Sequence, residues 1–477
     1  MLCSWHTITG ELSKGSELIC PSVYSTMLHS PSNPSGTALI LFLIILISRA
    51  ASRDILPLRS SFSVEELQSN VLQSPDGTFS CGFYSIYANA FTFSIWYSNS
   101  AQKTIIWSAN RDRPVHSRRS MLTLQKDGSM VLTDYDGTVV WHADGVGARY
   151  AHLLDTGNLV LEGTSGNILW QSFDSPTDTL VPTQPVTATT KLVSATQLHV
   201  SGHYIFRFSD MSILSLIYND PDVSDIYWPN PDAPFFENSR RRYNNTRLGV
   251  LDYLGQFVSS DFAVQQALVA SDAGPGIKRR LTLDPDGNLR IYSLNSTDGS
   301  WSVSMVVMPV SCKIHGFCGP NGICHYSPVP SCSCLPGYKM VHPGDWSQGC
   351  TAIVNTTCGA AQPVRFLKLP NTDFWGNDQQ ILESISFQAC KDICTSDCTC
   401  KGFLYVQGIG LCFQKSLLFS GRSYPSSDPR MMYIKLPVSV NISNMSIPQS
   451  NVLDSSPNVL KCDDTAQESY SYFQMIV

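Results

Sequence analysis

Short apolar stretches alternate with Asp-Gly turns between residues 122 and 161. The turns are Asp127-Gly128, Asp136-Gly137 and Asp155–Asn158. The apolar stretches that follow them are Met130–Leu132, Val139–Trp141 and Leu159–Leu161. Glycine supplies the positive φ of a tight hairpin turn, and β-branched residues suit the strands on either side. The pattern predicts one hairpin unit that repeats within a pseudo-symmetric, all-β domain.

The same pattern extends in both directions along the chain. Earlier strands are predicted at Phe79–Tyr84, Phe91–Trp96 and Thr104–Trp107. Much later, Leu281–Tyr292 repeats the strand, Asp-Gly turn and strand of Leu122–Leu132. We therefore expect a second, more degenerate domain of the same kind before residue 310.

Cysteine distribution separates the second half of the chain from the first. Twelve of the 16 cysteines lie between Cys312 and Cys412. A dense, even-numbered block predicts a disulfide framework in an oxidising compartment. The pairs Cys332/Cys334 and Cys398/Cys400 could also be zinc ligands, but signs of secretion favour disulfides over a metal site.

Those signs are an apolar run, Ala38–Ile47, and five N-x-S/T sequons. The run is too short to span a bilayer and fits the core of a signal peptide, with Ala50-Ala51-Ser52 as the cleavage region. Residues 1–52 are thus a signal peptide or an N-terminal extension. Translation could start at Met1, which would also allow an uncleaved anchor, or at Met27. The sequons are Asn244, Asn295, Asn355, Asn441 and Asn444. We expect a protein that is secreted or associated with the plasma membrane.

Charge and motifs exclude several function classes. The net charge of −6 gives no electrostatic case for nucleic-acid binding. There is no H-E-x-x-H, G-x-S-x-G or Walker loop, and no kinase H-R-D or D-F-G motif. We therefore predict no catalytic residue, no cofactor and no bound metal.

Two long segments resemble a known family. Ile106–Val115 (I-W-S-A-N-R-D-R-P-V) and Trp170–Pro182 (W-Q-S-F-D-S-P-T-D-T-L-V-P) resemble the bulb-type lectin domain of plant S-domain receptor-like kinases and S-locus glycoproteins. The segment Arg247–Phe257 resembles the S-locus glycoprotein region. The resemblance implies a mainly β fold with tandem β-prisms, each of three small antiparallel sheets about a pseudo-threefold axis. The prisms would occupy residues 53–186 and 187–310.

The resemblance also suggests which domains contain the cysteines between Cys312 and Cys412. Residues 311–351 are similar to an EGF-like module, and residues 352–437 to a PAN/apple domain with a helix at Phe387–Thr395. A polar, glycosylated tail, 438–477, would follow. The family's pairing implies the disulfides Cys312–Cys324, Cys318–Cys332, Cys334–Cys350, Cys390–Cys412, Cys394–Cys400 and Cys358–Cys398.

Bulb lectins bind mannose through the motif Q-x-D-x-N-x-V-x-Y. The best match here is Gln125-Lys-Asp127-Gly-Ser129-Met-Val131-Leu-Thr133. The resemblance therefore implies a degenerate sugar site at Gln125, Asp127, Ser129 and Val131. The alternative interpretation is that Asp127-Gly128 forms only a hairpin turn. Two further repeats would have lost the motif, with Ser74 and Thr78 around Asp76, and Leu153 and Gly157 around Asp155.

The resemblance implies extracellular recognition, without a kinase domain in this chain. Expected partners are a secreted peptide or protein ligand or a glycan, and a homodimer or a heterodimer with full-length receptor kinases. Two alternatives are a mannose-type lectin and a membrane receptor kinase whose remaining part lies downstream. Three basic clusters, Arg118-Arg119, Arg240–Arg242 and Lys278–Arg280, are either solvated loops or a contact surface for an acidic partner.

Overall fold

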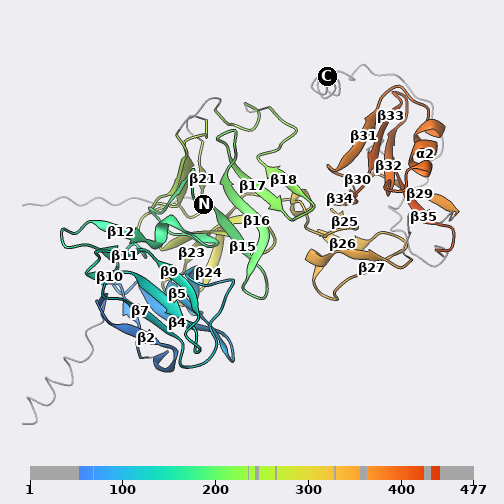
Figure 1. Ribbon diagram of the computed structural model, residues 1–477. Helices are drawn as coiled ribbons and strands as arrows, with labels where there is room; N and C mark the ends of the chain where they lie inside the picture. The colour runs from blue at the N-terminus through green and yellow to red at the C-terminus, as the bar shows by residue number, and fades with distance from the viewer. Residues whose placement is uncertain are drawn as a thin grey trace, which may run out of the picture. The chain divides into compact units, whose positions relative to one another are not determined.

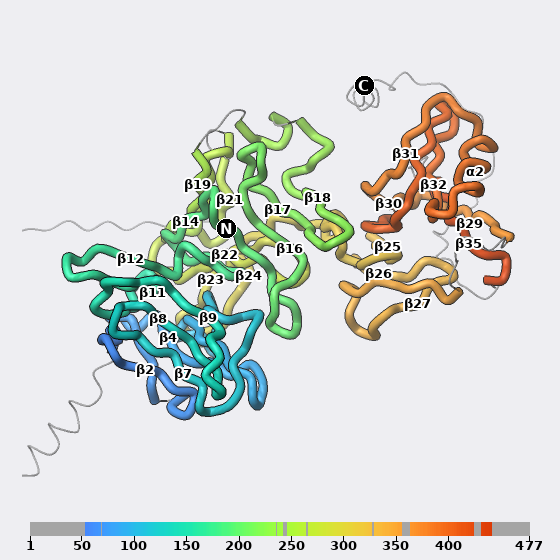
Figure 2. Tube along the Cα trace, in the orientation of Figure 1, coloured from blue at the N-terminus to red at the C-terminus, as the bar shows by residue number. Residues whose placement is uncertain are grey.

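The computed structural model describes residues 53–440, except 68, 235, 242–245, 264–265, 327–328, 355–362 and 424–430. The predicted signal segment and nearly all of the predicted tail lie outside these residues, as do Cys358 and all the sequons except Asn295. Within the described chain, strands predominate and α2 is the α-helix (Figures 1 and 2).

The N-terminal part forms three four-stranded antiparallel sheets, which we call the first prism. One sheet has the order β3 (Leu72–Gln73), β4 (Phe79–Tyr87), β5 (Ala90–Tyr97), β6 (Thr104–Ser108). The next is β2 (Ser61–Ser63), β7 (Met121–Leu124), β8 (Met130–Thr133), β9 (Val139–Ala143). The last is β1 (Ile55–Pro57), β10 (Tyr150–Leu153), β11 (Leu159–Glu162), β12 (Ile168–Gln171).

A second prism repeats this arrangement with three more four-stranded sheets. Their orders are β15 (Leu192–Ala195), β16 (Ser201–Phe208), β17 (Leu214–Asn219), β18 (Ser224–Trp228); β14 (Pro185–Thr187), β19 (Leu248–Leu251), β20 (Gln256–Ser259), β21 (Leu268–Val269); and β13 (Thr179–Leu180), β22 (Arg279–Leu283), β23 (Leu289–Leu294), β24 (Trp301–Val306). Each prism begins with three short strands, and three units of three strands each follow. The first unit pairs with the third short strand, the second unit with the second, and the last unit with the first. The nested connection shows that the second prism keeps the topology of the first.

Residue pairing repeats as closely as the topology. Ile95, Leu132 and Leu161 face Trp107, Trp141 and Trp170 across the last two strands of their sheets, and a register shift follows each pair. These tryptophans meet edge to face, with ring centroids 5.6–6.0 Å apart. The equivalent pairs of the second prism are Leu216–Trp228, Phe257–Leu268 and Ile291–Met305. The hydrophobic alternation of the sequence thus places one large side chain per sheet in each core.

The predicted boundary between residues 186 and 187 passes through β14. In addition, β13 lies before that boundary but pairs with β22 of the second prism. The chain therefore enters the second prism near residue 179. The S-P-T-D-T-L-V-P segment, which sequence reasoning assigned to the end of the first prism, supplies a strand to the second.

Residues 311–352 are held together by Cys312–Cys324, Cys318–Cys332 and Cys334–Cys350. The strands here are β25 (Gly322–His325), β26 (Ser331–Cys334), β27 (Tyr338–Met340) and β28 (Cys350–Ala352). Each of these disulfides has the pairing that the resemblance implied. The predicted boundary at residues 351–352 lies inside β28.

The C-terminal part contains a five-stranded sheet with the order β29 (Val364–Pro370), β35 (Met431–Pro437), β32 (Gly402–Val406), β33 (Leu411–Lys415), β31 (Asp378–Leu382). Helix α2 (Phe387–Ser396) packs beside β32. Its first turn is capped by Ser386, whose hydroxyl accepts from the amide of Ala389 at 3.1 Å. The helix ends one residue beyond its prediction.

Disulfides anchor this helix from its buried face. Cys390 and Cys394, one turn apart and fully buried, pair with Cys412 and Cys400 as predicted. Cys398 is also disulfide-bonded, and its predicted partner Cys358 lies outside the described residues. Strands β30 (Thr372–Phe374) and β34 (Gly421–Ser423) complete a sheet with β25 and β26. The segments predicted as EGF-like and PAN/apple modules therefore share one sheet.

Candidate ligand-binding faces

The predicted sugar site lies on the outward face of the β7–β8 hairpin. Gln125 and Asp127 are exposed, whereas the side chains of Leu124 and Met130, on either side of the turn, are buried in the core. The Asp127 carboxylate accepts from the Ser129 amide at 3.0 Å and from the Ser129 hydroxyl at 2.7 Å. The hydroxyl contact is the main cause that lowers the pKa of Asp127. Two of the predicted sugar ligands are thus bonded to one another.

The same turn leaves no space for a side chain at Gly128. Its φ is +98°, and a Cβ at this position would lie 2.4 Å from the Gly145 carbonyl and 2.5 Å from the Ala148 amide nitrogen. The Gly147 amide donates to the Asp127 carbonyl at 2.8 Å. Asp127-Gly128 is therefore a hairpin turn under a covering loop. That finding establishes the structural role and leaves the sugar-binding role a prediction.

The cross-strand pairs that contain the tryptophans serve as reference points, so the positions of the sugar motif can be located on other hairpins. On β10–β11 the positions of Gln125, Asp127 and Ser129 are taken by Leu154, Thr156 and Asn158. The assignment to Leu153 and Gly157 was wrong by one residue, because the turn here closes between Leu154 and Asn158. The Asp76 turn joins the first and second strands of its sheet, whereas Asp127 joins the second and third. It is therefore not an equivalent repeat.

Sequence reasoning missed the hairpin that keeps most of the motif. On β22–β23 the five positions are Asp284, Asp286, Asn288, Arg290 and Tyr292, so three of the five match the family's D, N and Y. The resemblance between Leu281–Tyr292 and Leu122–Leu132 was the signal that could have revealed it.

Arg290 occupies that face itself. Its guanidinium contacts Asp284 at 2.6 Å and Asp286 at 2.7 Å, and the Tyr292 hydroxyl donates to Asp284 at 2.8 Å. Asn288 is buried, and its amide donates to the Met308 carbonyl at 2.6 Å. The polar groups of this face thus bond to each other and to the backbone, which leaves few of them for a ligand.

In two of the three basic clusters one arginine is buried, so neither interpretation, a solvated loop or a contact surface, applies to Arg240 or Arg279. Arg279 is fully buried and donates to backbone carbonyls, among them that of Asp272 at 2.6 Å. Arg240 is buried against Asp261 at 3.1 Å, and burial lowers the pKa of Arg240 to about 10. Arg280 stacks on Tyr292. Arg118, Arg119 and Arg241 are exposed, so for these three residues both interpretations stay open.

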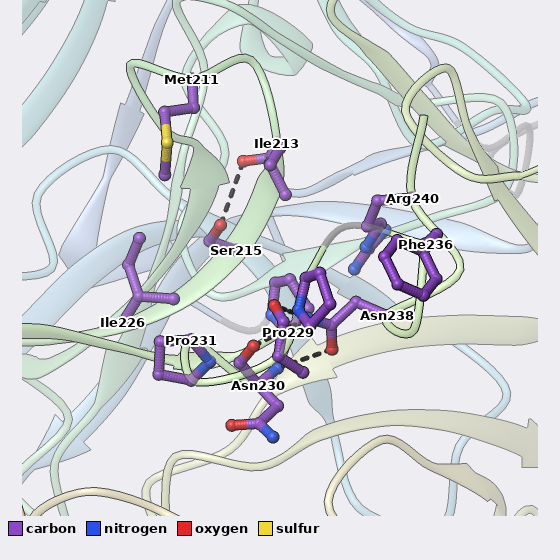
Figure 3. A pocket seen from close by; sticks show the side chains of 12 residues that line it. Met211, Ile213, Ser215, Ile226, Pro229, Asn230, Pro231, Phe236, Asn238 and Arg240 are labelled. Atoms are coloured by element: carbon purple, nitrogen blue, oxygen red, sulfur yellow. Dashed lines mark hydrogen bonds between the residues drawn. The ribbon is translucent and has the colours of Figure 1, made fainter. Parts of the chain in front are cut away.

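A pocket of about 720 Å³ lies on the outward face of the β16–β17 hairpin, beneath the chain that leaves β18 (Figure 3). Met211, Ile213 and Ser215 line it at positions equivalent to Asp127, Ser129 and Val131. Figure 3 shows Phe236, Asn238 and Arg240 across the pocket from Met211. Nothing in the sequence alone indicated this pocket, because its walls come from segments that meet only in the fold.

Arg240 fixes the wall of the pocket. Its guanidinium carbon lies 4.3 Å from the ring centroids of both Trp228 and Phe262. One guanidinium nitrogen donates to Asp261 and the other to the Leu214 carbonyl at 3.4 Å. This arrangement joins the segment after β18 to β17 and to the second-prism core.

Among the described residues, no three or more His, Cys, Asp or Glu side chains lie together in a way that could hold a metal ion. Nor does that part of the chain contain a helix long and apolar enough to cross a membrane.

Comparisons with known proteins agree with this architecture. The family model for D-mannose binding lectins matches residues 104–201, and the S-locus glycoprotein model matches residues 251–342. A Zea mays protein named as receptor protein kinase ZmPK1 is 63% identical over 440 residues, which are 90% of this chain and 54% of that protein. The Arabidopsis thaliana G-type lectin S-receptor-like serine/threonine-protein kinase SRK is 27% identical over 76% of this chain and 44% of its own length.

The chain thus spans about half the length of these two relatives. Among solved structures, the mannose-specific agglutinin of snowdrop (Galanthus nivalis) is 20% identical, with coverage of 23% of this chain and 90% of that one and a TM-score of 0.18. At that score the likeness carries no argument. The chain carries a D-mannose binding lectin domain followed by an S-locus glycoprotein domain, and it is a relative of the G-type lectin S-receptor-like kinases.

Proposed function

We propose that this chain recognises a ligand outside the cell, as the recognition part of a receptor of the S-receptor type. The observation that carries the proposal is the match of this chain to the two family models, together with its 63% identity, over 90% of its length, to a relative named as a receptor kinase. The pocket on the second prism gives the recognition function a place to act.

Disulfides and surface chemistry support an extracellular location. Five disulfides are present among the described residues, and such bonds persist in oxidising compartments. Asn295, in a sequon, lies exposed in the turn between β23 and β24. We infer that a glycan is attached there.

Direct contacts between the two prisms support a fixed binding surface. The Tyr97 hydroxyl donates to the Arg279 carbonyl at 2.7 Å, and the Trp301 indole donates to Thr104 at 2.9 Å. Arg111 of the first prism contacts Asp178 at 3.4 Å. Tyr97 and Arg279 are buried, so the hydrogen bond between them is shielded from water.

The ligand that this proposal favours is a secreted peptide or protein rather than mannose. On β7–β8 the Asp127 carboxylate is bonded to Ser129, and on β22–β23 Arg290 covers both carboxylates. Dimerisation with a second copy or with a receptor kinase is part of the proposal for the whole protein.

The proposal is tested with purified, oxidised protein immobilised on a sensor surface. Fractions of extracellular wash fluid and methyl α-D-mannoside are passed over it. We expect saturable binding from a proteinaceous fraction, lost after protease treatment of that fraction and after reduction of the chain. The absence of saturable binding from every fraction would contradict the proposal, and binding of the mannoside alone would replace it with the lectin alternative.

A further inference from the structure

The pocket lies on the outward face of the β16–β17 hairpin, at the position equivalent to the predicted sugar site on β7–β8. On β7–β8 this position carries Asp127 and Ser129, whereas on β16–β17 it carries Met211 and Ile213. At these two positions polar side chains in the first prism are thus replaced by apolar ones in the second, while Ser215 stands at the position of Val131. On β16–β17 the segment after β18 covers this position and encloses a pocket.

Most polar groups that line the pocket are already hydrogen-bonded within the chain, and the buried Nε of Arg240 is an exception. The Ser215 hydroxyl donates to the Ile213 carbonyl at 3.1 Å. The Asn238 amide donates to the carbonyls of Asn230 and Ala233 at 2.7 and 3.0 Å, and its oxygen accepts from the Asn230 amide at 3.0 Å. Arg240 is matched by Asp261. A saccharide would need several free donors and acceptors here, so the chemistry of the walls favours an apolar occupant.

The covering segment is held in place before any ligand arrives. Pro229, Pro231 and Pro234 restrict its backbone, and the Asn238 bonds close it on itself. Arg240 then fixes its end between Trp228 and Phe262. A preformed pocket binds more tightly than one that must be ordered on binding, because less conformational entropy is lost.

The mouth of the pocket has the features of a peptide-binding site. Met211 and Phe236 flank it and are 64% and 75% exposed. Methionine adapts its shape to different apolar groups. The pocket also borders β18, the edge strand of its sheet, and the exposed residue Asn230. Edge strands and exposed amides are what an extended peptide uses for main-chain hydrogen bonds.

We propose that this pocket receives a bulky apolar side chain from an extended peptide segment of the ligand. The inference rests on the proposed recognition function and narrows it to one class of ligand and one face of the second prism. The first prism would then serve in positioning the second one through the contacts of Tyr97, Arg111 and Trp301.

The test uses the disulfide-bonded chain with 13C-methyl-labelled methionine. The probe is a capped hexapeptide, acetyl-Ser-Gly-Phe-Leu-Gly-Ser-amide, compared with a version in which serine replaces Phe and Leu. Met211→Leu identifies the Met211 methyl signal. We expect the apolar peptide to shift this signal in a saturable way and the serine peptide, decanoate and methyl α-D-mannoside to leave it unchanged.

Phe236→Glu should lower the affinity for the apolar peptide by about tenfold or more, and a tenfold change corresponds to about 1.4 kcal/mol. Leu254→Glu is the matched control, because Leu254 is 44% exposed on the outward face of the β19–β20 hairpin. It should bind as the native chain does. An equal shift from the serine peptide, decanoate or mannoside, or no effect of Phe236→Glu, would overturn the inference. If the wash-fluid binding survives in that case, only the pocket assignment fails and the recognition function stands.

Discussion

Single residues at the turns show how much of this fold depends on backbone geometry. Gly128 and Gly137 both follow an aspartate in a hairpin turn and both have positive φ, +98° and +85°. A Cβ on Gly128 would strike the loop around Gly145, whereas a Cβ on Gly137 would meet nothing within 4 Å. The two turns are identical in sequence motif and differ only in what lies over them.

Gly128→Ala should therefore destabilise the chain more than Gly137→Ala. For Gly137→Ala we expect a loss of about 1 kcal/mol from the left-handed backbone alone. For Gly128→Ala the clash adds to that strain, and we expect a total loss of about 3 kcal/mol. Urea unfolding of both variants measures the difference, and equal losses would contradict the covering role of the 145–148 loop.

A single buried histidine, His315, makes the free energy of unfolding depend on pH. It is buried between the rings of Tyr227 and Trp375, and burial, with a smaller effect of Arg422, lowers the pKa of His315 to about 3. In the unfolded chain the pKa is about 6.5. The folded form therefore keeps its full stability above pH 6.5 and loses it as the pH falls below that value, since only the unfolded form gains the proton.

His315→Gln, which does not titrate, should reduce this loss. The native chain is expected to lose up to about 1.4 kcal/mol per pH unit below 6.5 from this one group. Unfolding free energies at pH 7, 6 and 5 give the slope for both proteins. A variant with the same slope as the native chain would show that His315 is not the group responsible.

At the scale of elements, a buried ion pair holds the segment after β18 against β17. Arg240 and Asp261 have side chains that are 2% and 0% exposed. Asp261 also accepts from the Leu214 amide at 3.1 Å. Removal of one partner would leave the other as an uncompensated charge in the core.

Arg240→Met should cost about 3–5 kcal/mol, because the Asp261 carboxylate would stay buried without its cation. The double variant Arg240→Met/Asp261→Asn should recover part of that stability, since neither charge remains. Thermal unfolding of the single and double variants forms the comparison. A double variant no more stable than Arg240→Met would indicate that the aromatic stacking of Arg240, and not the charge, holds the segment.

On the scale of the whole molecule, the chain contains two kinds of stabilisation. The described residues of the prisms have no disulfide, and Cys81 there is a buried free thiol. Their cores are large and apolar, with Leu132, Leu161, Phe206 and Ile291 fully buried. From residue 311 onward, the apolar clusters are smaller, and two of them include disulfide-bonded cysteines.

Reduction should therefore unfold the chain from residue 311 onward before the prisms. Disulfides of this kind are each worth about 2–5 kcal/mol in small domains. Hydrogen exchange after treatment with dithiothreitol should show lost protection in β25–β35 and retained protection in β4, β5, β16 and β17. Simultaneous loss in both regions would show that the shared contacts, such as Tyr218–Phe419 at 4.7 Å, make the molecule one cooperative unit.

Local chemistry determined much of this protein. The Asp-Gly turns and alternating apolar residues predict the hairpins, because hairpin turns and strand faces depend on near neighbours. Five disulfide pairings and helix α2 followed from the resemblance and are present. The motif at Gln125 also follows from the sequence, although its use for a sugar is still a prediction.

Tertiary structure decided whatever depends on segments distant in the sequence. It assigned β13 and β14 to the second prism, buried Arg240 and Arg279 that looked like surface charges, and built the pocket from β17, β18 and the segment that follows. A charge pattern does not reveal whether a carboxylate or a ring from another sheet will meet it. Burial and enclosure are properties of the packed chain, so only the fold could show which outward face of the prisms became a pocket.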